Sequence, residues 1–397
     1  MLTRRSFLQT AAAIPAVAAS QPKRIAMLAT AYTPLSQAQH MGDRFLVGYP
    51  YGGVWRMPEA KLTSLYVEKK PEGELSGARA REFGFDVYST VAGALRRGGK
   101  ELAVDAVLIF DDAGEGGLFE QCLQVFEQER RGVPVYQDRQ LAHSFEKART
   151  MFERSRRLRF PVLGGTSLPV TWRLPAIDLP VGCRVEEALM VGVGEGREFH
   201  AIEGLQCMVE RRRGGETGVK SVQLLEGDAV WKAGEAGRYS KELLISALSR
   251  SDTPLGFSDA DSRPQNLVAA GQLQVLARHP AAYLIEYRDG LKAAVLMLDG
   301  AVKDFNFAAR LSAPRQVLAT QFLVTPEPNA THSACLTQKV EQLIAGGAAP
   351  YPAERALLAG GVLESCLTSK EREHARLQTP QLKVAYQAPA EPQFAQA

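Results

Sequence analysis

The stretch "RIAMLATAYTPLSQAQH", residues 24–40, begins with a basic residue and an apolar run and ends in a polar segment. A short buried strand followed by a tight turn is the usual opening of a nucleotide-binding α/β unit. Such a turn normally carries glycines, because the backbone must approach a pyrophosphate closely. Residues 29–34 contain no glycine and end on Pro34, which lacks a backbone N–H. The segment therefore predicts a first strand at 24–30 and leaves the ligand of the turn open.

Strands and helices alternate through the first 160 residues. The run "VDAVLIF", residues 104–110, is continuously apolar, as expected of a parallel strand buried on both faces. Alternation of this kind predicts a doubly wound parallel sheet. Ser144 is placed as the N-cap of the last helix in this part. The predicted strands are 24–30, 62–68, 104–110 and 132–138, and the predicted helices are 75–85 (ending at Gly84), 90–99, 118–131 and 144–158.

The second half of the chain has a different pattern. Apolar segments separated by turn signals such as "RDG" and "LDG" predict antiparallel strands. One helix is predicted at about 198–212, and residues 332–370 return to helix. The tail 388–397 is rich in Pro and Ala, which predicts disorder. The predicted strand segments are 185–194, 219–231, 274–298, 303–311 and 316–324.

Charge, cysteine content and the N-terminus limit the class of protein. The net charge is +3, and the first twenty residues contribute two arginines and no acid, so the rest carries +1. That balance excludes a strong electrostatic footprint for nucleic acid or an anionic membrane. Five scattered cysteines without CxxC spacing argue against a zinc site or disulfide framework, although one isolated bridge stays open.

The first twenty residues resemble a twin-arginine export signal. Arg4 and Arg5 precede an apolar, alanine-rich run with a small-residue end. We expect a protein exported to the periplasm through the twin-arginine translocase, with residues 1–20 as its signal peptide. A disordered N-terminus that happens to carry two arginines is the alternative. Because this route carries folded proteins, the signal also favours a cofactor that is bound before export.

Several segments, taken together, resemble the Gfo/Idh/MocA family, named after glucose–fructose oxidoreductase and inositol dehydrogenase. The resemblance runs from about residue 24 to 387. It implies an α/β plus α+β protein: a Rossmann-type domain over 21–160 and a substrate and oligomerisation domain over 161–387 with a large, mostly antiparallel sheet. Helices in 332–370 are expected to pack back on the first domain. Besides the first strand and turn, the segments are "EFGFDVYSTVAGALRRGGKELAVDAVLIF" (82–110), "VPVYQDRQLAHSFEKARTM" (133–151), "EFHAIEGLQCMVE" (198–210) and "PYPAERALLAGGVLESCLTS" (350–369).

The resemblance implies a nicotinamide cofactor, NAD or NADP, although the motifs that would hold it are altered. At the first turn, the glycines are replaced, and hydroxyl groups would have to assist in holding a pyrophosphate. An acid near the family's ribose-binding position is followed by Lys69 and Lys70, which would tolerate a 2′-phosphate; a solvated loop is the alternative. Asp111, Asp112 and Glu115 make the end of strand 104–110 acidic, which argues against ordinary dinucleotide binding. The cofactor-binding candidates are Thr30, Ala31, Thr33, Ser36, Glu68 and Asp138.

The catalytic motifs are altered as well. The family's Glu-Lys-Pro becomes Asp138-Arg139-Gln140, and arginine stays charged, so it binds an anion but does not act as a base. His200 aligns with the family's catalytic histidine, while the family's aspartate falls on Gly196. Glu203, one helical turn further on, is expected to orient His200.

Other loops carry weaker candidates. Arg173, beside Trp172, is expected to contact substrate, as an arginine near this position does in the family. Gly214 and Gly215 favour a helix stop over a loop that reaches the site. His200 and Glu203 are too few ligands for a metal site.

Three functions are compatible with these residues. The first is an oxidoreductase that moves a hydride between a sugar- or polyol-like substrate and the cofactor, with His200, Arg139, Arg173 and Glu203 at the catalytic site. The second is a non-catalytic descendant that binds a sugar or small acid, since several motifs have changed together. The third is a lyase or hydrolase that uses transient redox chemistry on glycosides. Self-association into a homo-oligomer is compatible with each.

Overall fold

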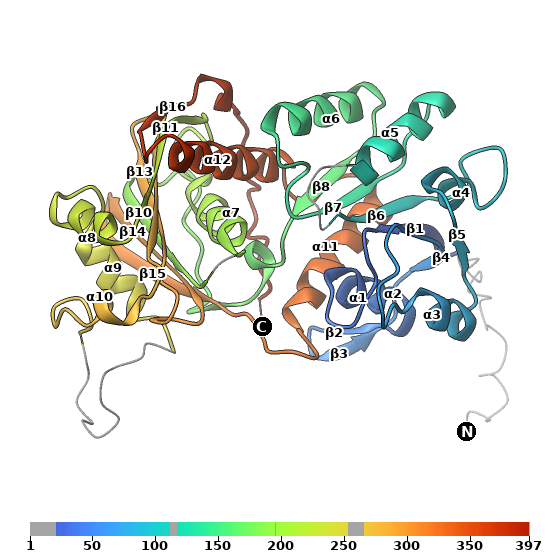
Figure 1. Cartoon of the computed structure of the whole chain (residues 1–397), viewed down its shortest axis with the longest axis horizontal. Coiled ribbons are helices and arrows are strands. Elements are labelled where there is room, and N and C mark those ends of the chain that lie inside the picture. Colours follow the sequence, from blue (N-terminus) through green and yellow to red (C-terminus); the bar gives the residue numbers. More distant parts are fainter. Residues whose placement is uncertain (1–20, 112–116, 195, 253–265, 397) are drawn as a thin grey trace, which may run out of the picture.

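The computed structural model of the chain describes residues 21–111, 117–194, 196–252 and 266–396. It contains two large sheets that lie side by side, with helices between and around them (Figure 1). The expected signal segment, Asp112 and Glu115 lie outside the described residues. Among the helices of the described ranges, none combines the length and apolar character that crossing a bilayer requires.

The first sheet is parallel throughout and has the strand order β5-β4-β1-β6-β7-β8. The order reverses between β1 and β6, and ligands of doubly wound sheets bind outside the carboxyl ends of the strands at that point. The predicted Rossmann-type sheet is confirmed. Its last strand, β8, lies beyond residue 160 and was not predicted. The strands are β1 (Lys23–Ala29), β4 (Ala60–Val67), β5 (Asp86–Tyr88), β6 (Ala106–Phe110), β7 (Val135–Asp138) and β8 (Val162–Gly165).

The helices of this part begin and end where local chemistry requires. The side chains of Thr90 and Ser144 accept backbone N–H groups and cap α4 and α6, and Gly84 ends α3 in the left-handed region with φ 70°. Strands β2 (Tyr49–Tyr51) and β3 (Val54–Arg56) form a separate two-stranded hairpin. The helices are α1 (Gln37–Gly42), α2 (Arg44–Val47), α3 (Ser76–Phe83), α4 (Val91–Arg96), α5 (Gly117–Glu129) and α6 (Phe145–Arg157).

Alternate residues of β1 enter two different cores. Ala26 and Leu28 pack with residues of α4, α5 and α6 on one face. Ile25 and Met27 pack on the other face with α1 and with α11 (His332–Gly346). Helix α11 comes late in the chain yet covers the first sheet, in agreement with the expected return of the terminal helices.

The second sheet has eight strands in the order β16-β11-β12-β13-β10-β14-β15-β9. It is mostly antiparallel, as predicted, but β10 and β13 pair in parallel. The "LDG" turn therefore does not form a hairpin, because β10 inserts between the strands on either side of that turn. The strands are β9 (Arg173–Leu174), β10 (Val185–Gly192), β11 (Val219–Glu226), β12 (Ala281–Tyr287), β13 (Lys292–Met297), β14 (Phe305–Ser312), β15 (Arg315–Phe322) and β16 (Leu377–Gln378).

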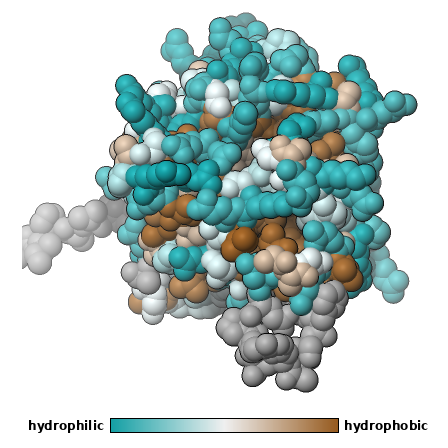
Figure 2. All heavy atoms as spheres, turned by 90° about the vertical axis from the view of Figure 1, so that its left-hand side faces the viewer, coloured by the Kyte–Doolittle hydropathy of each residue, from teal (hydrophilic) through white to brown (hydrophobic). Residues whose placement is uncertain are grey.

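Helices cover both faces of the second sheet. The outer face carries α8 (Asp228–Glu235), α9 (Lys241–Leu248) and α10 (Leu273–Leu276), which the sequence pattern did not predict. In particular, "GDAVW" starts a helix rather than extending a strand. The surface on this side is mostly hydrophilic with separate apolar areas (Figure 2).

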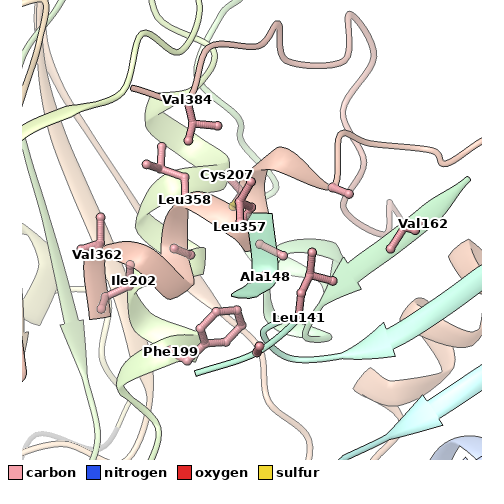
Figure 3. Packing of buried hydrophobic residues seen from close by; sticks show 14 of the residues in the cluster. Leu141, Ala148, Val162, Phe199, Ile202, Cys207, Leu357, Leu358, Val362 and Val384 are labelled. Atoms are coloured by element: carbon pink, nitrogen blue, oxygen red, sulfur yellow. The ribbon is translucent and has the colours of Figure 1, made fainter. Parts of the chain in front are cut away.

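Two helices lie between the sheets. Helices α7 (Glu198–Val209) and α12 (Glu354–Glu371) pack against each other. Phe199 and Ile202 of α7 lie close to α12 and to residues of the first domain (Figure 3). This packing fixes α7 against the first sheet and thereby the direction in which its polar side chains point.

The C-terminal segment is ordered by contacts, in contrast to the disorder that its composition predicts. After the short helix η2 (Pro380–Leu382), the chain returns to the junction of the two domains, where it meets the short helix η1 (Leu168–Val170). Phe394 is buried, and the Ala395 N–H donates to the carbonyl oxygen of Val170 at 2.9 Å.

Candidate functional site

The turn after β1 satisfies most of its own backbone groups. The Thr30 N–H donates to the Phe110 carbonyl oxygen at 2.9 Å, which ties β1 to β6. The Ser36 hydroxyl accepts from the N–H of Thr33 at 3.3 Å and of Gln39 at 3.2 Å, and donates to the Thr33 carbonyl oxygen at 2.7 Å. Ser36 thus caps α1, a helix of only six residues. Its expected role as a phosphate donor is replaced by this structural one.

Acidic side chains border this turn. The Thr30 hydroxyl lies 3.5 Å from Asp111 Oδ1, and Asp111 Oδ2 is buried without a hydrogen-bond partner. Glu68 is exposed directly after β4, and its N–H donates to the Ala29 carbonyl oxygen at 3.0 Å. Glu68 therefore follows β4 and lies beside the end of β1, where a ribose-binding acid is expected. Ala31 lies partly buried between these groups.

The end of β7 brings an acid and an arginine to the same edge. Asp138 is buried and accepts a hydrogen bond from the Tyr136 hydroxyl at 2.9 Å. Arg139 follows with φ 59°, a left-handed conformation, and bridges to Gly165 through two backbone hydrogen bonds of 2.9 and 3.1 Å. Its Nε is 3.6 Å from Asp138 and has no hydrogen-bond partner, and 43% of the side chain is exposed. Part of the guanidinium thus faces outward from the carboxyl edge.

His200, in the first turn of α7, belongs to the same site. Its pKa is lowered to about 3, first by burial and then by the charges of Arg139, Arg197 and His332. Its Nδ1 is buried without a hydrogen-bond partner. His200 is therefore a neutral imidazole at neutral pH, within electrostatic reach of Arg139.

Glu203 does not orient His200, in contrast to the sequence-based expectation. It is fully buried, and its Oε2 accepts the N–H and hydroxyl of Thr166 at 2.8 and 2.7 Å. A Cβ on Gly165 would lie 2.0 Å from Glu203 Oε1, so the glycine makes room for the carboxylate. Oε1 has no hydrogen-bond partner, and burial raises the pKa of Glu203 to about 7. The carboxyl group joins α7 to β8, because α7 lies directly against the end of that strand.

Arg173 is enclosed in the interior rather than open to a substrate. It pairs with Asp178 at 3.0 Å and lies over the rings of Phe322 and Phe394, at 4.9 and 4.5 Å from their centroids. Only 2% of its side chain is exposed. The expected contact with substrate gives way to a structural role, since two aromatic rings and an acid already surround the guanidinium group.

His332 is a site residue that the sequence did not single out. It begins α11, and its Nδ1 lies 3.1 Å from the Thr325 hydroxyl. Its pKa is lowered to about 4, first by burial and then by Arg44 and other cations, among them Arg197. His332 and Arg197 both lower the pKa of His200. The sequence shows only that His332 stands at the start of a predicted helical segment, and this does not indicate that the residue lies near α7.

Other features do not add chemistry to this edge. In the described ranges, no three His, Cys, Asp or Glu side chains are grouped to hold a metal ion. All five cysteines are free thiols. Glu216, in the loop that begins with Gly214 and Gly215, is buried and pairs with Arg212 at 3.0 Å. An open hollow of about 400 Å³ lies elsewhere, between α6 and residues 349–354, where Arg156 already pairs with Glu354.

Comparison with known proteins gives matches at the level of structure. No protein-family model and no curated protein sequence matches the chain. The solved structure of myo-inositol dehydrogenase from Lactobacillus casei, in complex with NAD(H) and myo-inositol, matches with a TM-score of 0.56 and 10% identity over 90% of this chain and 96% of that one. GenD2 from gentamicin A biosynthesis, in complex with NAD, matches with a TM-score of 0.56 and 12% identity, over 90% and 96%.

A third match agrees with these two. A putative myo-inositol dehydrogenase from Sinorhizobium meliloti has a TM-score of 0.54 and 13% identity, over 90% of this chain and 99% of that one. At identities this low, the structural similarity establishes the fold alone. The chain therefore has the two-domain architecture of inositol dehydrogenases and related NAD-binding oxidoreductases.

Proposed function

We propose that the chain is a divergent Gfo/Idh/MocA-type oxidoreductase that binds a nicotinamide cofactor and acts on a sugar- or polyol-like substrate. The observation that carries the proposal is that Glu203 joins α7 to Thr166 after β8, while Arg139 at the end of β7 is bound to Gly165 of β8. This brings His200 of α7 within electrostatic reach of Arg139 at the carboxyl edge of the first sheet. Solved proteins of the same fold are bound to NAD and, in one case, myo-inositol. Ligands of this architecture bind at that edge.

The two residues have distinct roles. Arg139 remains charged and holds substrate oxygens through the exposed part of its guanidinium. His200 is neutral, and its unpartnered Nδ1 accepts the proton of a substrate hydroxyl. When bound, the cofactor supplies the hydride acceptor. Burial of α7 against α12 keeps His200 fixed while the proton moves.

The fit of the cofactor differs between its two ends. Glu68 is exposed beside the end of β1 and is suited to hold ribose hydroxyls. At the turn, Thr30 and Thr33 use their N–H groups within the protein, so Ala31 and the Thr33 hydroxyl are left to contact the phosphates. Asp138 borders the substrate end. We therefore expect weaker pyrophosphate contacts than a glycine-rich turn provides.

The cofactor is tested on the full chain after purification. The supernatant released by heat is analysed by mass spectrometry, and the melting temperature is measured with NAD⁺ and NADP⁺. We expect bound nucleotide, or a higher melting temperature with one of the two, because ligands that bind the folded state stabilise it. Glu68→Ala is expected to weaken this effect, whereas Glu72→Ala, an exposed acid in the same loop, is the matched control. Absence of nucleotide together with no shift by either cofactor would refute the proposal.

A non-catalytic binding protein is the second candidate. The self-satisfied turn and the low pKa of His200 favour it, since a base with a pKa of about 3 is weak at neutral pH. The two candidates differ in the effect of His200→Ala, with His143→Ala as an exposed control. An oxidoreductase loses turnover by about 100-fold or more while keeping its nucleotide. A binding protein shows ligand binding, no turnover, and the same affinity in both variants.

Export is proposed separately from the chemistry. Arg4 and Arg5 with the apolar run that follows them support a twin-arginine signal. Replacement of both arginines by lysine is expected to leave the protein in the cytoplasm of an expressing bacterium. Equal periplasmic amounts of the parent and the double variant, measured by fractionation, would exclude this route.

A further inference from the structure

Three basic side chains at the ends of their elements lie within electrostatic reach of His200. Arg139 follows β7, Arg197 precedes α7, His200 lies in the first turn of α7, and His332 begins α11. We call these four residues the basic cluster. The other three members all act electrostatically on His200, and Arg197 also acts on His332. Arg139 and Arg197 are permanently charged, whereas His332, with a pKa of about 4, is neutral at neutral pH.

The nearby acid offsets this charge only in part. Asp138 is the carboxylate next to Arg139, but the two are 3.6 Å apart and Asp138 accepts the Tyr136 hydroxyl at 2.9 Å. Within the described residues, Arg197 forms no ion pair, and its side chain lies at the surface. The local field at His200 is therefore positive.

Two nitrogen atoms of the basic cluster are buried and lack hydrogen-bond partners. They are His200 Nδ1 and Arg139 Nε, which come from α7 and from the end of β7. Buried polar atoms are nearly always hydrogen-bonded, and leaving one unpaired is costly. A carboxylate on a ligand would supply the acceptor for Arg139 Nε and oppose the positive field, and a hydroxyl group of the same ligand would donate to His200 Nδ1.

We infer that the polyol taken at this site carries a carboxylate, which Arg139 and Arg197 hold while a hydroxyl group of the same molecule faces His200. This inference rests on the proposed function and names its substrate class: an aldonate or uronate type of sugar acid. The planar guanidinium fork matches the two oxygens of a carboxylate. A phosphate monoester carries nearly two charges, and Asp111 and Asp138 on the neighbouring strand ends disfavour the second one.

Such a ligand also prepares His200 for its role. Burial is the main cause of the lowered pKa of His200. The charges of Arg139 and Arg197 lower it further, and His332 acts in the same direction. A bound carboxylate opposes these charges and raises the pKa of the imidazole toward neutrality. Binding of the acid group and readiness to accept a proton are thus coupled in the same cluster.

The test compares matched pairs of probes by calorimetry on the full chain. D-gluconate is paired with D-glucitol, and D-glucuronate with D-glucose, so that each pair differs in its carboxylate. We expect at least one acid to bind roughly 10-fold or more tighter than its neutral partner, the size of a charge-assisted hydrogen bond. Arg139→Gln and Arg197→Gln should each remove most of that preference, whereas Arg81→Gln, an exposed arginine of α3, should keep it. Melting curves of each variant confirm that it is folded.

Three outcomes would overturn the inference. They are equal affinity within both pairs, no binding by any of the four probes, and tighter binding of D-glucose 6-phosphate than of either acid. Nucleotide content, measured on the same samples, separates the two proposals. Bound nucleotide with no preference for acids overturns the inference and leaves the proposed function standing. A clear, arginine-dependent preference for acids in protein that binds no nucleotide supports the inferred acid site and overturns the proposed oxidoreductase function.

Discussion

Glu203 is a carboxyl group held in a place that water does not reach. One oxygen is bound by Thr166 and the other faces Gly165 without a partner. Burial of the charged form is unfavourable, which raises the pKa of Glu203 from 4.5 to about 7. Glu203 therefore joins α7 to the end of β8. Its carboxyl group holds a proton at a higher pH in the folded state than in the unfolded chain.

The first prediction concerns the pH dependence of stability. Because the folded-state pKa of Glu203 is raised, its contribution is fully present below about pH 4 and is lost as the pH rises through about 7. The free energy of unfolding should fall by up to about 3 kcal/mol from this group between pH 5 and pH 8. Glu203→Gln should flatten the fall, as measured by urea denaturation. Glu153→Gln, on an exposed face of α6, should keep the parent slope, and identical slopes in all three proteins would contradict the assignment.

The turn after β1 shows how an element can keep its place and change its chemistry. In this chain the hydroxyl of Ser36 closes the turn and caps α1. The glycine-rich turn of this architecture leaves its N–H groups to the pyrophosphate. Here the N–H groups of Thr30 and Thr33 are already bound, and the chain itself completes the turn.

A second prediction separates capping from ligand binding at Ser36. Ser36→Ala should lower the free energy of unfolding by about 1 kcal/mol, because an N-cap is lost. Ser36→Asn should restore stability, since asparagine is also a good N-cap. If Ser36 acts only as a cap, Ser36→Asn and the parent retain the same amount of nucleotide, measured by mass spectrometry. A selective loss of nucleotide in a fully stable Ser36→Asn variant would return Ser36 to the phosphate site.

Local patterns predicted the elements better than the contacts between them. Strands β1, β4, β6 and β7, the caps at Gly84 and Ser144, and the long helices each depend on neighbours in sequence, whereas the three-residue strand β5 was not predicted. Strand β8 was missed because it is four residues long and half glycine. The parallel pairing of β10 with β13 was missed because an inserted strand leaves no mark on the turn that it separates.

The candidate site shows the same limit. His200 and Arg139 were found by resemblance to known motifs, whereas His332 was not, because its partners come from distant parts of the chain. Arg173 and Glu203 have the residue types expected of a polar site. Burial decides their roles, and burial depends on tertiary packing: Arg173 contacts the rings of two phenylalanines, and Glu203 lies against Gly165.

At the scale of the whole molecule, the C-terminal segment joins the two domains. Lys339 of α11 bonds Gln393 at 3.0 Å, and Arg211, after α7, donates to the Pro389 carbonyl oxygen at 2.8 Å. Phe394 covers Arg173. These contacts hold α7 and α11, and with them His200 and His332, in a fixed relation to the first sheet.

A third prediction follows for this segment. Phe394→Ala should lower the free energy of unfolding by about 3 kcal/mol, because a buried ring is lost and Arg173 is uncovered. Gln396→Ala, at an exposed position two residues later, should have little effect. Chemical denaturation of the two variants checks this. Equal stabilities would mean that the segment does not tie the domains together.

The fourth prediction addresses the position of the cofactor. In a crystal structure of the chain grown with the nicotinamide nucleotide that binds it, we expect the dinucleotide at the carboxyl ends of β1 and β6, with its nicotinamide ring between Arg139 and His200 and its adenosine ribose at Glu68. A dinucleotide bound away from this edge, or one whose nicotinamide ring contacts neither Arg139 nor His200, would contradict the account.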